Sequence, residues 1–318
     1  MRKIEVTDWT IPGSDDQPIY GSTHWPDPAM LLEYERPRGV LICCHGFKGY
    51  KDYGFFPALC HAAAQAGLLA HRFNFSHSGM TNQIETFEHP NLFEKDTWGR
   101  QVEDLTLVSS IAHCVRRFPD EYSWDLYDPE IPVIYFGHSR GGVTTTLTAA
   151  RSFATDFYGR FWQAYGGSPP AGLITAAAPD YACNLDDLAK DQLRAEGRLL
   201  SPSGRTGQQL YVGRDWLEEI ERDPELYDPT LAAAHIKCPM LILHGDDDDT
   251  VSIDCAKNLH KAATPNSELA IVQGANHVFN APNPLPANTP MDELAPQTRA
   301  LIQHSIDFAI RCCERHKS

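Results

Sequence analysis

The chain has 318 residues, enough for two average domains or for one α/β domain with an insertion, and either would bury a full core. Hydrophobic residues make up 42% and charged residues 22% of the chain, a globular composition that excludes disordered and collagen-like chains. The formal net charge of −15 would repel phosphate backbones and anionic lipid, which argues against nucleic-acid and membrane-surface partners.

The sequence also bears on where the protein works. No apolar run approaches the ~20 residues of a membrane span, and the first residues, MRKIEVTDWTIPGSDD, lack the apolar stretch of a signal peptide. The nine cysteines are odd in number and form no CxxC pair, a pattern typical of reduced, buried thiols rather than of a disulfide framework. We therefore expect a cytoplasmic protein.

Short apolar runs alternate with longer amphipathic stretches along the chain. The first two expected strands flank a turn-rich sequence, and the next six are apolar on both faces, as buried parallel strands are. The expected strands are Lys3–Ile11, Gln17–Trp25, 39–45, 68–75, 131–137, 171–177, 239–245 and 268–274. The expected helices are Phe55–Ala66, Trp98–Arg117, Arg140–Phe153, Ile253–Ala263 and Pro296–Cys313. This alternation predicts an α/β fold, a mostly parallel eight-stranded sheet with helices on both faces and functional residues at the carboxyl ends of the strands.

One segment interrupts the alternation. About 57 residues separate the sixth and seventh expected strands, where a crossover needs roughly a dozen. This segment contains a polar stretch and an amphipathic piece around Trp216. We expect residues 1–180 and 238–318 to form the core, and residues 181–237 to form a cap or lid over the site. The alternative is an ordinary crossover with additions.

The fifth expected strand runs into Gly137-His138-Ser139-Arg140-Gly141 and then into an expected helix. This is the G-x-S-x-G pattern in a strand–turn–helix context, where a sharp turn lifts the serine hydroxyl above the sheet. Glycines are needed because side chains do not fit beside so tight a turn. We predict that Ser139 is a nucleophile. The alternative is a glycine-rich turn whose serine has no chemical role.

A serine hydroxyl is a weak nucleophile and needs a base that is held by an acid. His277 is the only histidine in the loop after the last expected strand, so it is the predicted base. The acid is expected in the run Asp246–Asp249 after the seventh strand, since acid and histidine follow the serine in this order in such an architecture. We favour Asp248, because Val251 three residues later can pack into the core and fix the loop, and its two neighbours in the run stay open as alternatives. The run lacks the calcium-loop pattern, so no metal site is expected.

Acyl transfer by such a serine also needs two N–H donors for the negative oxygen that develops on the substrate. The backbone amide of Arg140, directly after the nucleophile, is one candidate, and the amide of Phe47, in the loop after the third strand, is the other. Gly46 would let this loop approach the substrate closely. His77, after the fourth strand, and Trp216, in the insertion, are expected to contact the substrate. For His77 the alternative is a hydrogen bond to the backbone at the rim of the site, and for Trp216 it is a place in the core.

The segments HGFKG, GHSRGG, HGDDDDTV and GANHVF, in this order and spacing, resemble the α/β-hydrolase superfamily over nearly the whole chain. HGF, RFNFSHSG and GHSRGG together resemble bacterial serine carboxylesterases of the cinnamoyl/feruloyl-esterase and dienelactone-hydrolase-like groups. The resemblance implies the α/β-hydrolase fold and an esterase without cofactor that cleaves small-molecule esters through an acyl-enzyme. It assigns catalysis to Ser139, His277 and Asp248, and the oxyanion donors to Phe47 and Arg140.

This chain differs from several related groups at the residues that define them. Dienelactone hydrolases carry cysteine where this chain has Ser139, and haloalkane dehalogenases carry aspartate there. The HGGG loop of another lipase and esterase group is also absent. Amide or peptide cleavage, carbon–carbon bond hydrolysis and a catalytically silent binding protein stay open as alternatives. The sequence does not identify the ester or decide between a monomer and a homodimer.

Overall fold

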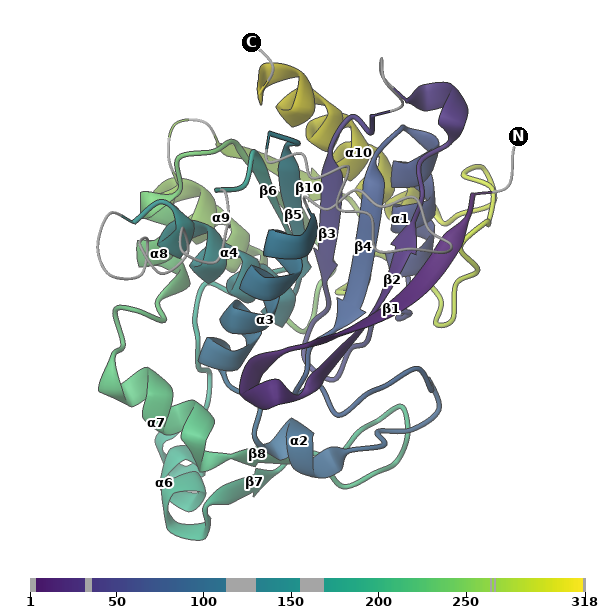
Figure 1. Cartoon of the computed structure of the whole chain (residues 1–318). Coiled ribbons are helices and arrows are strands. Elements are labelled where there is room, and N and C mark those ends of the chain that lie inside the picture. Colours follow the sequence, from purple (N-terminus) through teal and green to yellow (C-terminus); the bar gives the residue numbers. More distant parts are fainter. Residues whose placement is uncertain are drawn as a thin grey trace.

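The structure of the chain is a computed structural model that describes residues 4–31, 36–112, 130–154, 169–263, 265 and 267–316. An eight-stranded sheet forms its centre, with the strand order β1-β2-β4-β3-β5-β6-β9-β10 (Figure 1). β2 pairs antiparallel with both β1 and β4, and the other pairs of the sheet are parallel. The predicted mostly parallel, eight-stranded sheet is confirmed.

The elements follow the expected order along the chain. The strands of this sheet are β1 (Val6–Pro12), β2 (Pro18–His24), β3 (Val40–Cys44), β4 (Leu69–Asn74), β5 (Val133–His138), β6 (Gly172–Ala176), β9 (Met240–Gly245) and β10 (Ser267–Val272). The helices are α1 (Phe56–Gln65), α2 (Pro90–Glu94), α3 (Trp98–Ala112), α4 (Arg140–Ser152), α6 (Asp187–Glu196), α7 (Arg214–Arg222), α8 (Pro229–His235), α9 (Ile253–Ala262) and α10 (Pro296–His316). The part of the predicted helix after Ala112 lies outside the described residues.

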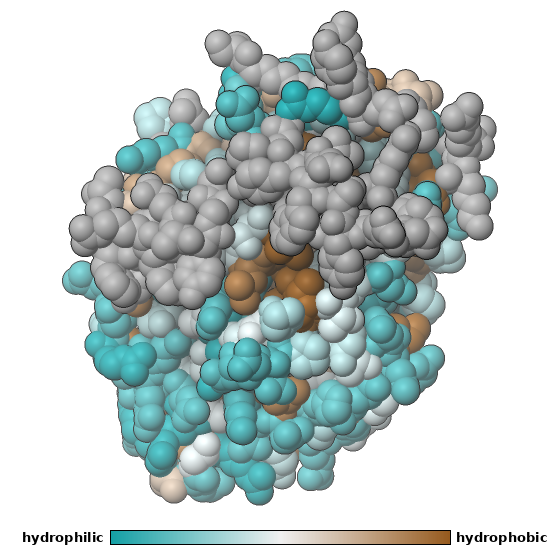
Figure 2. All heavy atoms as spheres, viewed as in Figure 1, coloured by the Kyte–Doolittle hydropathy of each residue, from teal (hydrophilic) through white to brown (hydrophobic). Residues whose placement is uncertain are grey.

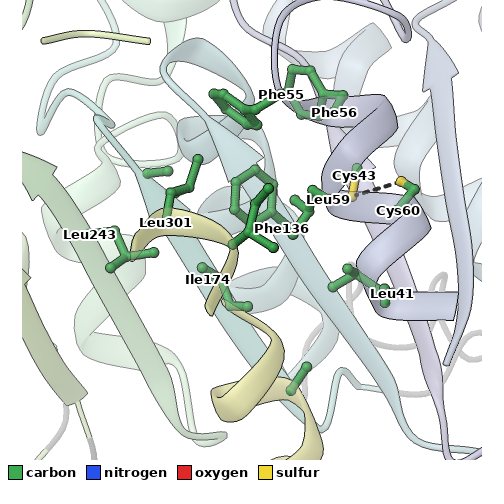
Figure 3. Packing of buried hydrophobic residues seen from close by; sticks show 14 of the residues in the cluster. Leu41, Cys43, Phe55, Phe56, Leu59, Cys60, Phe136, Ile174, Leu243 and Leu301 are labelled. Atoms are coloured by element: carbon green, nitrogen blue, oxygen red, sulfur yellow. Dashed lines mark hydrogen bonds between the residues drawn. The ribbon is translucent and has the colours of Figure 1, made fainter. Parts of the chain in front are cut away.

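The central strands are buried on both faces because helices cover the sheet on each side. Alternate residues of β3 enter different cores, as the two-residue period of a strand requires. Leu41 and Cys43 pack with residues of α1 and α10, whereas Val40 and Ile42 pack with residues of α3, α4 and α9. Figure 3 shows the first of these cores, in which Phe136 of β5 lies among side chains of α1 and α10.

The cysteines that the structure describes are free thiols, and all but Cys183 are buried. Cys60 of α1 has its Sγ 3.7 Å from the Sγ of Cys43 in β3 (Figure 3). Burial raises the pKa of the Cys43 and Cys44 thiols, which keeps them protonated and unreactive. The described cysteines other than Cys183 are thus buried, as the sequence indicated.

The long segment between β6 and β9 contains short elements of its own. β7 (Arg198–Leu200) and β8 (Tyr211–Gly213) form a small antiparallel hairpin, and the amphipathic piece around Trp216 is helix α7. In Figure 1 this hairpin lies with α2, α6 and α7 below the sheet. Gln208 links the hairpin loop to the segment before α2: its side-chain oxygen accepts from the Phe87 amide at 2.7 Å, and its nitrogen donates to the Phe87 carbonyl at 2.9 Å. Helix α8 packs instead against α4 and α9.

The surface is polar over most of the face that Figure 2 shows, and apolar residues gather near its middle. A polar surface agrees with the net charge of −15. Among the described residues, no helix combines the length and the apolar character that crossing a membrane requires.

Candidate active site

Ser139 occupies a sharp turn between β5 and α4. Its backbone has a positive φ of 54°, which residues other than glycine rarely adopt, and its amide donates to the Ala176 carbonyl at 2.8 Å. The turn brings backbone atoms so close that a Cβ on Gly137 would collide with the Gly141 carbonyl, and a Cβ on Gly141 would collide with the Cys44 carbonyl. Glycine is therefore required at both positions, and the turn places the Ser139 hydroxyl at the carboxyl edge of the sheet.

His277, in the loop after β10, joins this serine to Asp248. Its Nε2 is 3.1 Å from Ser139 Oγ, and its Nδ1 is 2.9 Å from Asp248 Oδ2. An ionised carboxylate can only accept, so we assign the proton of the neutral ring to Nδ1, which leaves Nε2 to accept from the hydroxyl. Three loops at one edge of the sheet thus form a single hydrogen-bonded chain.

Asp248 is the member of the aspartate run whose side chain is fully buried, while the other three are exposed. Its Oδ1 accepts from the amides of Thr250 and Val251, both at 2.9 Å, and Val251 is buried as the sequence suggested. Burial opposes ionisation of Asp248, but hydrogen bonds from His244, His277 and the Val251 amide outweigh it and lower the pKa of the carboxyl. The acid is therefore held as a carboxylate.

His138, directly before Ser139, supports His277 from behind. Its Nε2 donates to the His277 carbonyl at 2.8 Å, and the two ring centres are 4.9 Å apart. Burial is the main cause, and the nearby His277 ring a lesser one, that lowers the pKa of His138 to about 3, so the His138 ring stays neutral. No role was predicted for His138, and its place inside the G-x-S-x-G pattern is the only signal of this contact in the sequence.

The loop after β3 lies against the serine. A Cβ on Gly46 would be 2.9 Å from Ser139 Cβ and 3.4 Å from its Oγ, so this backbone borders the hydroxyl. His45 fixes the loop, because its Nε2 accepts from the Phe75 amide at 3.3 Å and its Nδ1 donates to the Gly46 carbonyl at 2.9 Å. Burial lowers the pKa of His45 to about 4, which keeps the ring in the neutral form that these two bonds need.

The Arg140 side chain lies among aromatic rings contributed by three parts of the chain. Its guanidinium carbon is 4.5 Å from the Trp98 ring centre, 5.5 Å from that of Phe47 and 5.7 Å from that of Trp216. Its Nη2 pairs with Asp96 Oδ2 at 3.1 Å, and burial raises the pKa of Asp96 to about 6. Within the described ranges, no protein atom accepts a hydrogen bond from the backbone amide of Arg140 or of Phe47. The cluster brings Phe47, Arg140 and Trp216 together beside the serine.

His77 is not brought to Ser139. Its ring is buried, and its Nδ1 lies 3.2 Å from Ser14 Oγ and 2.9 Å from Ser76 Oγ, while its Nε2 faces Asp15 at 3.7 Å. These contacts join the turn after β1 to the loop after β4. The His77 ring is thus hydrogen-bonded to serine side chains, and the expected contact with a substrate stays a prediction.

Comparisons with known proteins place these features in context. The family model described as "Alpha/beta hydrolase family" matches residues 41–295, and a search of curated proteins finds no match. Among solved structures, Est1E from Butyrivibrio proteoclasticus is similar at 14% identity and a TM-score of 0.61, over 96% of this chain and 98% of that one. Est1E has also been solved with ferulic acid bound.

Two further structures are similar in the same way. The esterase domain of a Rhodothermus marinus protein has 15% identity and a TM-score of 0.58, over 97% of this chain and 99% of that one. Dienelactone hydrolase from Anabaena variabilis has 15% identity and a TM-score of 0.54, over 96% of this chain and 98% of that one. At these identities the likeness shows a shared fold.

Proposed function

The chain belongs to the alpha/beta hydrolase family, which confirms the predicted fold, and we propose that it is a serine hydrolase that cleaves carboxylic esters of small molecules. One observation carries the proposal. Ser139 Oγ, the His277 ring and Asp248 Oδ2 form an uninterrupted chain with separations of 3.1 and 2.9 Å. Such a chain activates a serine hydroxyl, because the ring can take the hydroxyl proton while the carboxylate stabilises the resulting positive charge.

In the acylation step, Ser139 Oγ attacks the ester carbonyl carbon while its proton passes to His277 Nε2. Asp248 keeps the ring oriented and balances the charge of the imidazolium. The carbonyl oxygen becomes an oxyanion, to which the amides of Arg140 and Phe47 donate in our proposal. Because no other protein atom in the described ranges accepts from these amides, both are available for this purpose. One such donor contributes about 3 kcal/mol to lowering the barrier.

Two further steps complete the cycle. The tetrahedral intermediate collapses and breaks the bond to the alcohol oxygen, which takes the proton from His277 Nε2 and leaves as the free alcohol. Water then gives a proton to His277 and adds to the acyl carbon, and the second intermediate releases the acid as the proton returns to Ser139. The sum is ester plus water giving acid plus alcohol, and the enzyme is restored.

We also propose that the insertion between β6 and β9 acts as a cap over this site. Its helix α7 places Trp216 against Arg140, the residue after the nucleophile. Lys48, next to Phe47, donates from Nζ to the Pro202 carbonyl of the insertion at 2.7 Å. The loop that carries one proposed oxyanion donor is thus in direct contact with the insertion, and Trp216 is in a position to border the substrate.

An ester series tests the proposal. We expect the purified protein to hydrolyse p-nitrophenyl esters between acetyl and lauroyl, or methyl ferulate, and Ser139→Ala to lose at least about 10³-fold in kcat. Ser152→Ala is a matched control, since Ser152 lies at the other end of α4 and its hydroxyl donates to the Ala149 carbonyl. It should keep full activity.

The proposal fails if Ser139→Ala is as active as the parent protein. It also fails if a folded parent protein neither hydrolyses any of these esters nor reacts with a fluorophosphonate at Ser139.

A further inference from the structure

His244 lies on the opposite side of Asp248 from His277. It is the last residue but one of β9, and its ring is fully buried. Its Nε2 is 2.9 Å from the Val251 carbonyl oxygen and 3.3 Å from Asp248 Oδ2. A carbonyl and an ionised carboxylate can only accept, so Nε2 carries a proton that faces both oxygens.

Two histidines therefore share one oxygen of the acid. His277 Nδ1 approaches Asp248 Oδ2 at 2.9 Å, and His244 Nε2 approaches the same atom at 3.3 Å. The Val251 amide donates to Oδ1 while the Val251 carbonyl accepts from His244. The His244 side chain thus contacts both the carboxylate and the loop that positions it.

We infer that His244 is a positioning residue for the proposed hydrolysis, one that holds Asp248 through the shared oxygen and limits how strongly this acid supports His277. The inference rests on the proposed function, because it gives His244 a part in the same reaction. His244 acts through Asp248 and has no contact with Ser139 in this arrangement.

The sharing of Oδ2 has an effect on the base that can be measured. A donor to a carboxylate reduces the negative charge that the carboxylate offers to other partners, so removal of the His244 N–H strengthens the hold of Asp248 on the His277 imidazolium. In a plot of kcat/KM against pH, the acidic limb reports protonation of the base in the free enzyme. This limb then moves to higher pH. Among the described residues, His138 and Tyr181 are further titratable neighbours of the Asp248–His277 pair. Burial lowers the pKa of His138 to about 3 and raises the pKa of Tyr181, so both stay neutral throughout this limb.

Three substitutions of His244 separate positioning from packing. His244→Gln keeps an N–H donor near the place of Nε2, His244→Asn carries the same amide on a shorter side chain, and His244→Leu removes the donor. We expect Gln to keep kcat within about threefold and to leave the acidic limb in place. His244→Asn and His244→Leu should lower kcat at least about tenfold with little change in KM. They should also move the acidic limb to higher pH by roughly half a pH unit.

His24→Leu is the matched control for loss of a buried imidazole. His24 is fully buried in β2, and its Nε2 lies 2.7 Å from Arg72 Nη1, away from the Ser139 chain. This variant should lose thermal stability as the His244 variants do, but keep the parent kcat and acidic limb. Titration of Ser139 with a fluorophosphonate counts active sites, so kcat refers to folded enzyme in every variant.

The outcomes distinguish the inference from the proposed function. If Asn and Leu at position 244 leave both kcat and the limb unchanged, the inference is overturned and the hydrolase proposal stands. A loss of kcat without a shift of the limb, and without rescue by Gln, also overturns it, because such a loss reports packing alone. A parent protein that neither hydrolyses esters nor reacts with the fluorophosphonate overturns both.

Discussion

Replacing Asp248 by asparagine tests the identity of the acid within the aspartate run. Asparagine has nearly the same shape, so its amide oxygen can keep the bonds from the Thr250 and Val251 amides at 2.9 Å. Its NH2 group then faces His277 Nδ1, where the carboxylate oxygen accepted at 2.9 Å. An NH2 group cannot accept the Nδ1 proton, so the neutral ring moves its proton to Nε2. In that tautomer His277 can no longer accept a proton from Ser139.

The expected loss of kcat follows from the two functions of the Asp248 carboxylate. It selects the tautomer of His277, and it stabilises the imidazolium that forms in the reaction. The same acid-to-amide change in a serine protease lowers kcat by about 10⁴, which corresponds to about 5.5 kcal/mol of barrier. A single hydrogen bond to a charged group is worth about 1.5–3 kcal/mol, which sets a lower limit of roughly tenfold. Because both functions are lost together here, we expect Asp248→Asn to lower kcat by between about 10² and 10⁴.

The chain offers two matched controls for this experiment. Asp247 and Asp249 are exposed neighbours, and Asp247→Asn and Asp249→Asn make the same chemical change. The three variants are compared by kcat on p-nitrophenyl acetate, with active sites counted by fluorophosphonate titration. Both controls should stay within about twofold of the parent. A large loss in a control, with activity kept in Asp248→Asn, would refute the assignment and the burial argument behind it.

Two further predictions concern the loop after β3 and stability toward acid. Gly46→Ala puts a Cβ 2.9 Å from Ser139 Cβ and 3.4 Å from its Oγ. We therefore expect kcat to fall at least about tenfold with little change in the unfolding temperature. A variant with the kcat of the parent would contradict this. Burial lowers the pKa of several histidines to about 3 or 4 in the folded protein. In the unfolded chain the same histidines bind protons near pH 6.5. The free energy of unfolding should therefore fall as the pH drops from about 6.5 towards 4. These histidines are His24, His45, His71, His77 and His138. Burial raises the pKa of Asp96 to about 6 and of Asp104 to about 7, which favours the folded state on acidification, but these two shifts oppose five. Thermal unfolding at about pH 7.5 and about pH 5 measures the sign, and a higher unfolding temperature at the lower pH would show that the argument is wrong.

Local patterns were sufficient to predict the sheet and the proximity of Ser139, Asp248 and His277. Apolar runs of strand length identify buried parallel strands, and the carboxyl ends of parallel strands share one edge of a sheet. Ser139, Asp248 and His277 each follow such a run, so their proximity could be expected before any contact was known. The choice of Asp248 rested on Val251, an apolar residue in a polar loop, and the structure buries it.

Contacts between distant segments could not be predicted in this way. His77 follows a strand at the correct edge, but its partner Ser14 is 63 residues away in a turn whose conformation no local pattern reveals. The hairpin of β7 and β8 has three residues in each strand, too few to show a period of two, and α2 has only five. Elements this short depend on contacts with distant segments, such as the hydrogen bonds between the Gln208 side chain and the Phe87 backbone.

The histidines at or next to the carboxyl ends of strands illustrate the same limit. A carbonyl in a loop beyond the end of a strand has no ladder partner, so it needs another donor when the loop is buried. Within the described residues, three histidines supply that donor. His45, His138 and His244 donate to the carbonyl oxygens of Gly46, His277 and Val251, respectively. Each of these carbonyls belongs to a loop that carries one part of the candidate site. The positions of the candidate site residues therefore depend on imidazoles whose partners become visible only once the loops have folded.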